Sequence, residues 1–226
     1  ETCIEAFHNS GKYLSNHRTY DPNDPNAYYN IEGLSSPRVR HFLNNICSQE
    51  GAVYLEVGVY AGSTFCAAIQ NNDMEAAYAN DNWSQPNLQP NREELKLNLE
   101  DVTVDTFVNN LQENITTETL DFDIQVLNGD SSGLSKKDFK HDVNIIFYDG
   151  DNAEYKMREF FLKMLSFTAD VFTLIIDDAN IQTNVEITKR FIEANKLKVL
   201  YERELLNDQE DSKMWWNGLY VCVLAK

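Results

Sequence analysis

Short apolar runs alternate with segments of helical periodicity along the chain after residue 50. Runs of this length, rich in β-branched and aromatic residues, are typical of strands. They lie at 52–57, 76–80, 123–128, 143–148, 171–176, 197–201 and 218–224. Helical patterns lie at 63–72, 92–113, 153–166 and 184–195. Because helices connect successive strands, we expect right-handed crossovers and a parallel sheet that is covered on both faces.

The two ends of the chain depart from this alternation. Residues 1–36 are polar and rich in turn-forming residues, which predicts an N-terminal extension or lid. Ser36 precedes Pro37, a typical helix start, and predicts a helix that runs to about Cys47. An acidic loop joins the last two strands, which suits an antiparallel hairpin. The expected fold class is α/β: a Rossmann-like, seven-stranded, mostly parallel sheet with helices on both faces and an antiparallel C-terminal strand.

Length and charge limit the class of partner. The 226 residues suffice for one α/β domain with a sizeable core. The net charge is −17, because 36 Asp and Glu oppose only 19 Lys and Arg. Such a field repels phosphate backbones, so we expect no nucleic-acid partner. No apolar run approaches the ~20 residues of a membrane span, so we expect no membrane partner either.

The cysteines indicate a reducing environment. None of the four stands in C-x-x-C spacing, which favours free thiols over a disulfide framework and predicts a cytoplasmic location. They are Cys3, Cys47, Cys66 and Cys222.

Acidic residues follow each of the first five predicted strands, and no cationic cluster accompanies them. These residues are Glu56, Asp81, Asp130, Asp149 and the adjacent pair Asp177 and Asp178. In a parallel α/β sheet the ligand lies beyond the carboxyl ends of the strands, near the point where the strand order reverses. The sequence therefore predicts an acid-lined ligand site at that edge.

The loop after the first strand reads Glu-Val-Gly-Val-Tyr-Ala-Gly-Ser-Thr and begins at Glu56. Gly58 and Gly62 give a G-x-x-x-G spacing, which differs from both the dinucleotide and the phosphate-loop patterns. A nearby acid and the lack of basic residues disfavour a pyrophosphate and favour a cationic or neutral ligand with hydroxyls. Asp81, which closes the second strand, is placed to accept both hydroxyls of a ribose.

From about residue 50 to 226 the chain resembles class I S-adenosylmethionine-dependent methyltransferases. The stretch "YLEVGVYAGST" is similar to their first motif, above all to the catechol-type O-methyltransferases, where an aromatic and a hydroxyl residue occupy the positions of Tyr60 and Thr64. The resemblance implies that the loop from Gly58 to Gly62 cradles the methionine part of the cofactor, with Glu56 and Thr64 close by. It divides the chain into residues 1–48, an N-terminal extension or lid with a helix, and 49–226, a cofactor-binding methyltransferase domain.

The same resemblance assigns residues to the nucleoside part of the cofactor. Asp81 would hold the ribose, and Asn82 and Trp83 would lie beside the adenine. Asp130 and Ser131 would contact the adenine edge. Two alternatives stay open: Trp83 only covers the sheet, and Ser131 only caps a helix.

Three acids follow the fourth and fifth strands, which are neighbours in this topology. Asp149 and Asp177 are separated by 28 positions, and Asp178 follows directly. Three carboxylates gathered without a cation would raise each other's pKa and destabilise the fold. A hard divalent cation removes this conflict, because Mg²⁺ accepts a few carboxylates together with waters and substrate oxygens.

The spacing of these acids resembles the Mg²⁺ site of metal-dependent O-methyltransferases, and "DGDNAEY" resembles a region of macrocin-type sugar O-methyltransferases. There the cation binds the acceptor hydroxyl. Catechol-type enzymes carry a lysine base at the position of Asn152, and many metal-free relatives carry histidine. Asp149, Asp151 and Asn152 are therefore the candidate catalytic residues, with metal-bound hydroxide as another base. Alternatively, Asp149 contacts only the cofactor, and Asp177 and Asp178 cap a turn.

These observations predict an S-adenosylmethionine-dependent methyltransferase that methylates a hydroxyl of a small molecule or sugar with Mg²⁺. Three alternatives remain: a metal-independent methyltransferase, a non-catalytic cofactor-binding module and, least favoured by the glycine spacing, a nicotinamide oxidoreductase. Both a monomer and a homo-oligomer stay open. Aromatic residues that either stack on the acceptor or cover apolar surface are Tyr13, Tyr20, Tyr28, Tyr29, Trp215 and Trp216. His141 lies eight residues before Asp149, so we expect it at the opposite edge of the sheet.

Overall fold

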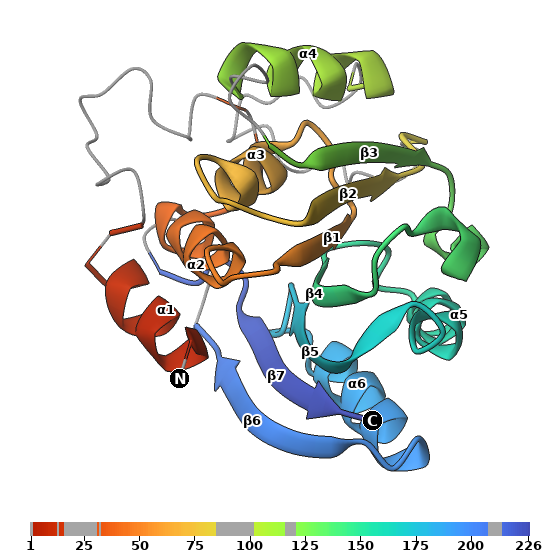
Figure 1. The fold of residues 1–226 in the computed structure, drawn as a ribbon. Coiled ribbons are helices and arrows are strands. Elements are labelled where there is room, and N and C mark those ends of the chain that lie inside the picture. Colours follow the sequence, from red (N-terminus) through yellow and green to blue (C-terminus); the bar gives the residue numbers. More distant parts are fainter. Residues whose placement is uncertain are drawn as a thin grey trace.

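The computed structural model describes residues 2–12, 14–15, 31, 33–84, 102–115, 121–207 and 214–226. A seven-stranded sheet with the order β3-β2-β1-β4-β5-β7-β6 forms its centre (Figure 1). The strands are β1 Val53–Val57, β2 Ala76–Asp81, β3 Asp123–Asn128, β4 Val143–Tyr148, β5 Thr168–Ile176, β6 Lys198–Leu205 and β7 Leu219–Ala225. Strands β1 to β5 pair in parallel, and β7 runs antiparallel to both β5 and β6. The predicted mixed sheet and the C-terminal hairpin are confirmed.

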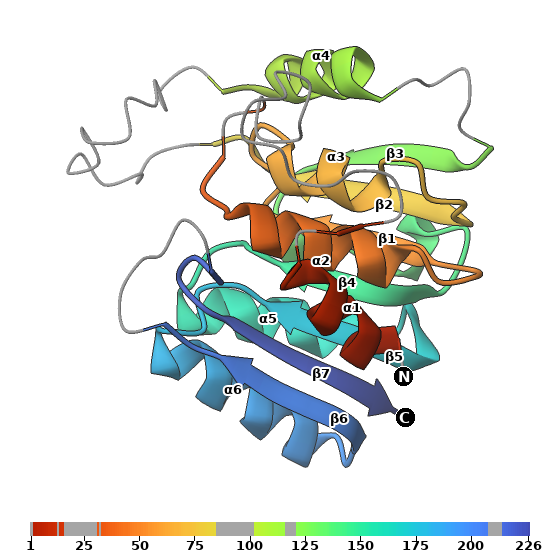
Figure 2. The same cartoon turned by 90° about the vertical axis from the view of Figure 1, so that its left-hand side faces the viewer.

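Helices cover both faces of this sheet (Figure 2). The α-helices are α1 Thr2–Ser10, α2 Pro37–Cys47, α3 Ser63–Ile69, α4 Val104–Asn114, α5 Glu154–Met164 and α6 Gln182–Ala194, and the short 3₁₀ helices are η5 Ser131–Gly133 and η6 Lys136–Asp138. Apolar residues of α1 to α4 form one core with the sheet, and those of α5 and α6 form a second core on the other face.

Burial on both faces explains the apolar runs of the central strands. All five residues of β1 are buried, with Tyr54 in one core and Leu55 in the other. A strand covered on both sides needs apolar residues at nearly every position rather than at alternate ones. Glu56 is the one residue of β1 with a carboxyl group, and two hydroxyl groups hydrogen-bond to it.

The helix predicted after Ser36 begins as expected. The Ser36 side chain accepts a hydrogen bond from the Val39 backbone N–H at 3.2 Å, and Pro37 occupies the first turn. The serine side chain satisfies one of the backbone N–H groups that have no partner at a helix start, and proline has no N–H to satisfy. The predicted bounds of α2 are therefore confirmed.

Other elements differ from the expectation in extent. Strand β5 begins at Thr168 rather than at 171, and β6 continues to Leu205 rather than ending at 201. Their additional residues are mostly exposed, so hydrophobic periodicity could not mark them. Helix α4 begins at Val104 after a Thr103 capping box, whereas the helix was predicted from 92; residues 92–101 lie outside the described residues.

Helix α1 was not predicted. Its sequence is short and mostly polar, but Cys3, Ala6 and Phe7 are buried on one side. Phe7 stacks on Phe42 of α2 with ring centroids 4.6 Å apart. The beginning of the chain thus shares a core with the sheet rather than lying apart from it.

The sheet order places a switch point beside β1. From β1 the chain adds β2 and β3 on one side, and then returns to add β4 and β5 on the other. The helices that follow β1 and β4, α3 and α5, therefore lie on opposite faces of the sheet, which marks the position where ligands bind in such folds. The described residues that were predicted to bind the cofactor or the metal lie at or after the carboxyl ends of strands β1 to β5.

Candidate functional site

Backbone hydrogen bonds align the strand ends at the switch point. The Gly58 N–H donates to the Asn80 carbonyl at 2.8 Å, and the Asp149 N–H donates to the Val57 carbonyl at 2.8 Å. The Asp177 N–H donates to the Tyr148 carbonyl at 2.9 Å. The acids that follow β4 and β5 are thus held at the same level of the sheet as the glycine loop.

The glycine loop packs directly against the end of β4. Gly58 has φ +90°, and a Cβ there would lie 2.0 Å from the Asp149 carbonyl oxygen. Gly62 has φ +92°, and its Cβ would lie 2.7 Å from the Phe107 ring. Both the left-handed backbone and the lack of space require glycine.

Glu56 is fully buried beneath this loop. The Tyr54 hydroxyl donates to its Oε2 at 2.6 Å, and the Thr64 hydroxyl donates to its Oε1 at 2.6 Å. Burial raises the pKa of Glu56 to about 8, although both hydroxyl hydrogen bonds favour the ionised form. Thr64 was expected beside the methionine part of the cofactor together with Glu56, and that placement stays a prediction.

Asp81 joins the glycine loop to the loop after β2. Its Oδ2 accepts the Tyr60 backbone N–H and its Oδ1 accepts the Trp83 backbone N–H, both at 2.7 Å. The Trp83 indole N–H in turn donates to the Tyr60 carbonyl at 2.9 Å. Each Asp81 oxygen retains acceptor capacity for a ligand hydroxyl, because a carboxylate oxygen has two lone pairs.

Asn82 and Trp83 follow Asp81 directly in the chain and differ in exposure. Asn82 is exposed, and its Oδ1 accepts the Ser84 backbone N–H at 2.9 Å. Trp83 is half-buried and stacks on Phe107 of α4 with centroids 5.8 Å apart. Trp83 therefore covers part of the core with one ring face, and its contact with the adenine stays a prediction.

Asp130 begins the turn after β3 and connects it to α5. Its Oδ1 accepts the Ser132 N–H at 3.0 Å, and its Oδ2 pairs with Lys156. The hydrogen bond from Lys156, followed by the one from Ser132, lowers the pKa of Asp130 to about 2. Ser131 starts the η5 turn. The ion pair to Lys156 was not foreseen, because the two residues lie far apart along the chain.

The three acids after β4 and β5 converge as predicted. One carboxylate oxygen each from Asp149, Asp177 and Asp178 lies within 4.8 Å of the others. Burial first, and then the neighbouring carboxylates, raise the pKa values of Asp149 and Asp177 well above the ordinary value. Three hard oxygen donors that repel each other in a partly buried place form a donor set that fits Mg²⁺.

Asn152 faces this cluster through Asp178. Its amide N–H donates to Asp178 Oδ2 at 2.6 Å, and its Oδ1 accepts from the amide of Asn184 at 2.8 Å. The amide of Asn217 donates to the other Asp178 oxygen at 2.7 Å. Asn184 and Asn217 were not singled out in the sequence, because isolated asparagines carry no pattern.

Asp151 lies apart from the carboxylate cluster. Its side chain is exposed, and its Oδ1 accepts the Ala153 backbone N–H at 2.8 Å at the start of α5. This contact orders the turn into the helix.

Strained backbone gathers around the same edge. Six described non-glycine residues have positive φ, and four of them lie in the loops just described or in the turn before β7. These four are Tyr60, Trp83, Asp178 and Trp216. Such conformations persist where the surroundings hold them, and they cluster at functional sites.

Only some of the aromatic residues that were predicted to contact the acceptor lie among the described residues. Tyr13, Tyr20, Tyr28 and Tyr29 lie outside the described residues. Trp215 is buried and packs edge-on against Phe7 and Phe42, at 5.7 and 6.0 Å. This residue covers apolar surface, which is the alternative that the sequence left open.

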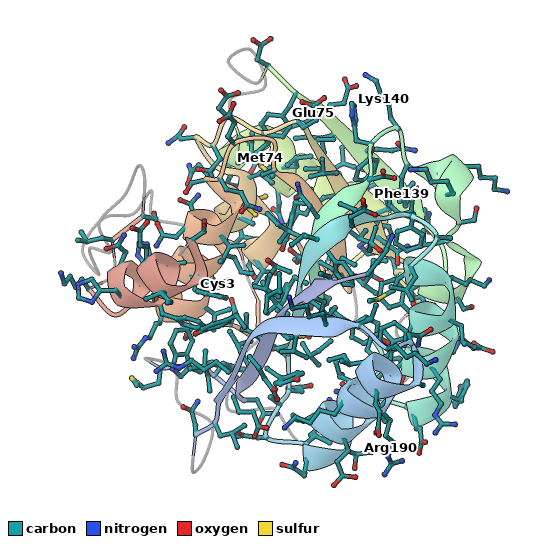
Figure 3. The ribbon with its side chains drawn as sticks, turned by 60° about the horizontal axis from the view of Figure 1, so that its bottom comes forward. Cys3, Met74, Glu75, Phe139, Lys140 and Arg190 are labelled. Atoms are coloured by element: carbon teal, nitrogen blue, oxygen red, sulfur yellow. The ribbon has the colours of Figure 1, made fainter. Side chains whose placement is uncertain are left out.

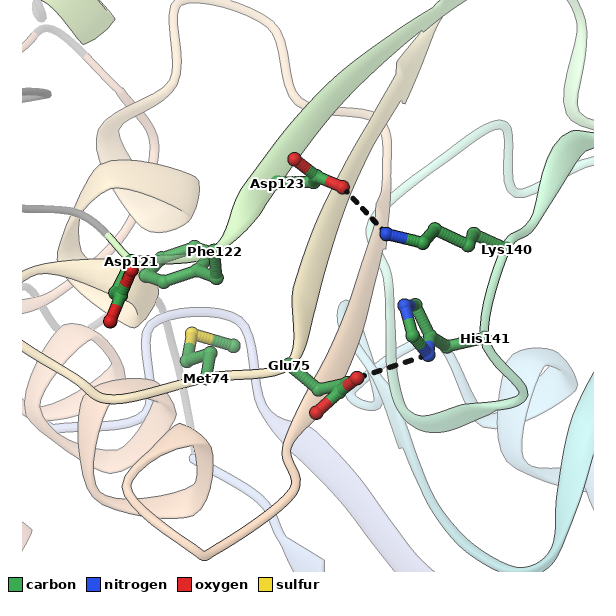
Figure 4. A pocket seen from close by; sticks show the side chains of 7 residues that line it. All are labelled: Met74, Glu75, Asp121, Phe122, Asp123, Lys140 and His141. Atoms are coloured by element: carbon green, nitrogen blue, oxygen red, sulfur yellow. Dashed lines mark hydrogen bonds and ion pairs between the residues drawn. The ribbon is translucent and has the colours of Figure 1, made fainter.

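The opposite edge of the sheet holds a cavity of about 450 Å³ (Figure 3, Figure 4). Its lining comes from the amino ends of β2, β3 and β4, and includes His141, as expected from its position in the chain. His141 pairs with Glu75 at 3.2 Å, and Lys140 pairs with Asp123 at 3.2 Å (Figure 4). These are exposed or half-exposed pairs far from the switch point, and we assign them no ligand.

No protein-family model and no curated protein sequence matches the chain. Solved structures do match it. A candidate RNA methyltransferase from Pyrococcus horikoshii is 15% identical over 100% of this chain and 96% of its own, with a TM-score of 0.53. TrmK from M. capricolum, in complex with S-adenosylhomocysteine, is 13% identical over 86% of this chain and 70% of its own, with a TM-score of 0.54. The chain has a class I methyltransferase fold.

The fold does not by itself choose the reaction. A precorrin 8w decarboxylase from Methanobacterium thermoautotrophicum also matches, at 15% identity over 87% of this chain and 94% of its own, with a TM-score of 0.55. Matching structures also include an rRNA methylase and a candidate tRNA methyltransferase, and two matching structures hold S-adenosylmethionine. At these identities the substrate must be argued from the site of this chain.

Two further expectations concern the whole chain. All four cysteines are free, as predicted, and all four are buried. No helix among the described residues is long and apolar enough to cross a membrane. A cytoplasmic location stays a prediction.

Proposed function

We propose that this chain transfers a methyl group from S-adenosylmethionine to an acceptor. The observation that carries the proposal is the junction at Asp81, whose carboxylate ties the glycine loop to the loop after β2 beside the switch point. Its remaining lone pairs suit the two ribose hydroxyls, and the loop from Gly58 to Gly62 lies where the methionine part would follow. A sulfonium cation also suits an edge that is lined by acids.

The other proposed cofactor contacts are assigned from where each residue lies relative to the glycine loop and Asp81. Tyr60, Glu56 and Thr64 surround the methionine end. Asn82 and Trp83 lie on the nucleoside side, with Asp130 and Ser131 across the sheet edge. Asp149, whose backbone carbonyl abuts Gly58, borders the point where the methyl group would face the acceptor.

For the reaction itself, we propose O-methylation of a hydroxyl with Mg²⁺ held by Asp149, Asp177 and Asp178. The support is the carboxylate cluster and the mutual repulsion that a cation would relieve. When bound, Mg²⁺ lowers the pKa of a coordinated hydroxyl and orients it. The chain's own part is to hold acceptor and sulfonium in line and to exclude water.

In this proposal a carboxylate, rather than the amide of Asn152, accepts the proton of the acceptor hydroxyl. Asn152 stands where related enzymes place a base, but both ends of its amide are paired with Asp178 and Asn184. An amide does not accept a proton near neutral pH. Asp149 and the exposed Asp151 are the candidate proton acceptors, and Asn152 serves orientation.

The matching RNA methyltransferases favour RNA as a second candidate acceptor. The net charge of −17 and the acids at the site oppose it, because phosphates would meet a field of the same sign. We therefore favour a small hydroxylated acceptor that carries no negative charge.

Asp81→Asn tests the cofactor site. The substitution replaces a charged acceptor of two backbone N–H groups and two ribose hydroxyls, so we expect S-adenosylhomocysteine binding to weaken at least about tenfold. Calorimetric titration measures this. Asp73→Asn, at an exposed turn before β2, is the matched control and should bind like the wild type. Equal affinity in all three proteins would contradict the proposed ribose contact.

A methyl-transfer assay with labelled S-adenosylmethionine then distinguishes between the candidate acceptors. Catechols, other hydroxylated small molecules, sugars and RNA transcripts are offered with and without EDTA. Transfer to a hydroxylated compound that EDTA abolishes supports the proposal. Transfer that EDTA does not affect excludes the Mg²⁺ role, and transfer to RNA alone favours the second candidate. Cofactor binding without any transfer would favour a non-catalytic module.

A further inference from the structure

Asp178 has a backbone conformation that brings two adjacent aspartates to one point. Its φ of +54° lies in the left-handed region, which residues other than glycine adopt only uncommonly. In a continued strand, Asp177 and Asp178 would point to opposite faces of the sheet. The left-handed turn instead lets both carboxylates join Asp149 within 4.8 Å.

Three asparagine side chains hold this turn from three different elements. Asn217, just before β7, and Asn152, after β4, each donate to one oxygen of the Asp178 carboxylate, at 2.7 and 2.6 Å. Asn184 of α6 is fully buried and donates to the Asp178 carbonyl at 3.3 Å and to Asn152 Oδ1 at 2.8 Å. The Asp178 carboxylate is thus oriented on both of its oxygens.

We propose that Asn217 and Asn152 are positioning residues that hold the Asp178 carboxylate for a divalent cation shared with Asp149 and Asp177. This inference rests on the metal part of the proposed function. Neutral amides suit the task, because they fix the direction of the carboxylate without cancelling the charge that attracts the cation. Each oxygen of Asp178 still has a lone pair for a metal ion.

The backbone around Asn217 is held independently of its side chain. The Asn180 N–H donates to the Asn217 carbonyl at 3.0 Å, and the Ala179 N–H donates to the Gly218 carbonyl at 3.1 Å. Gly218 has φ +87°, and a Cβ there would lie 2.6 Å from Asn180 Oδ1. Because these contacts fasten the segment before β7 to the turn after β5, Asn217→Ala removes only the amide that orients Asp178.

The test is a calorimetric titration of Mg²⁺, and separately of Ca²⁺, into protein saturated with S-adenosylhomocysteine. Asn217→Ala and Asn152→Ala should each weaken Mg²⁺ binding by about 10- to 100-fold, the usual effect of losing a partner of a metal ligand. Ca²⁺ should lose less, because it tolerates irregular coordination whereas Mg²⁺ demands near-octahedral geometry. The ratio of Mg²⁺ to Ca²⁺ affinity should therefore fall in both variants.

Asn207→Ala is the matched control. Its amide donates to the Trp216 carbonyl, one residue from Asn217, and it does not contact Asp178. The control should bind both ions within about twofold of the wild type, and S-adenosylhomocysteine binding should stay unchanged in all variants. If Asn217→Ala does not fold, Asn217→Ser, whose side chain is too short to reach Asp178, replaces it.

Three results would overturn the positioning role. Unchanged Mg²⁺ affinity in both variants would show that the amides do not matter to the cation. An equal loss for both ions, or a matching loss in Asn207→Ala, would show that the whole edge has loosened. A wild-type protein that binds S-adenosylhomocysteine but no Mg²⁺ would remove the metal site together with this inference, and would leave the cofactor site standing.

Discussion

Individual carboxyl groups of this site differ because their surroundings differ. Glu56 is enclosed by apolar core and two hydroxyls, and burial raises its pKa to about 8. Asp130 lies at the surface beside Lys156, and the pKa of its carboxyl falls to about 2. Burial thus favours the protonated form of Glu56, whereas the Lys156 pair favours the ionised form of Asp130. Carboxyl groups along one sheet edge therefore have different partners: Glu56 lies in the core and Asp130 pairs with Lys156.

Glu56 should make stability depend on pH. Its folded pKa of about 8 exceeds the ordinary value of 4.5, so the folded state binds the extra proton. Its contribution is complete below pH 4.5 and is lost as pH rises to about 8, at up to about 1.4 kcal/mol per unit. We expect Glu56→Gln to flatten this decline of the unfolding free energy, measured by urea unfolding between pH 5 and 8 without divalent cations.

Part of the decline should remain in that variant, because burial and mutual repulsion act in the same direction on Asp149 and Asp177. Glu159→Gln, an exposed substitution on α5, should follow the wild-type curve. Parallel curves for Glu56→Gln and the wild type would show that Glu56 does not hold the extra proton.

Gly58→Ala tests the close approach of the glycine loop to β4. A Cβ at this position would lie 2.0 Å from the Asp149 carbonyl oxygen, on a backbone with φ +90°. We expect a loss of at least about 2 kcal/mol of unfolding free energy and weaker S-adenosylhomocysteine binding. Gly133→Ala, where a Cβ would meet nothing within 4 Å, should change neither quantity beyond small effects. Wild-type melting and binding in Gly58→Ala would contradict the loop geometry.

At the scale of elements, helix α1 shows how packing overrides a weak local pattern. It contacts α2 through Phe7 and Phe42, and Tyr201 of β6 lies 6.2 Å from Phe7. Elements from both ends of the chain therefore meet in one core. The proposed division at residue 48 can be tested through this contact, because a separate lid would unfold without affecting the sheet.

Phe7→Ala should destabilise the whole sheet core. Phe7 is 6% exposed, and removing a buried aromatic side chain typically costs about 3–5 kcal/mol. We expect a single cooperative transition, by circular dichroism and tryptophan fluorescence, at a clearly lower urea midpoint. Ile4→Ala on the same helix is the control: Ile4 is 60% exposed, so its loss should change little. Two separate transitions would indicate that the N-terminal part folds on its own.

At the scale of the whole molecule, topology and charge act together. The strands β1 to β5 run in parallel, so the acids at or after the carboxyl ends of these five strands share one edge of the sheet. The net charge of −17 extends the same sign over the molecule. Such a field attracts a cationic cofactor or a divalent cation and repels a polyanion.

The sequence by itself determined the type and order of most elements, the glycine loop and the acids that follow the strands. Strands that are buried on both faces require continuous apolar runs, and tight turns with positive φ require glycine. Both features can therefore be recognised in the sequence. The spacing of Asp149 and Asp177 also sufficed to predict their convergence, because parallel neighbours end at the same edge.

Only the tertiary structure decided which side chains meet across the chain. The pairing of Asp130 with Lys156, the amides of Asn152 and Asn217 on Asp178, and the docking of Phe7 each join residues that are distant in sequence. Single polar residues have no periodicity, and a short helix with only three buried hydrophobic residues has a weak one. Their partners depend on how the crossovers and the β7 turn return the chain to the sheet, which no local pattern encodes.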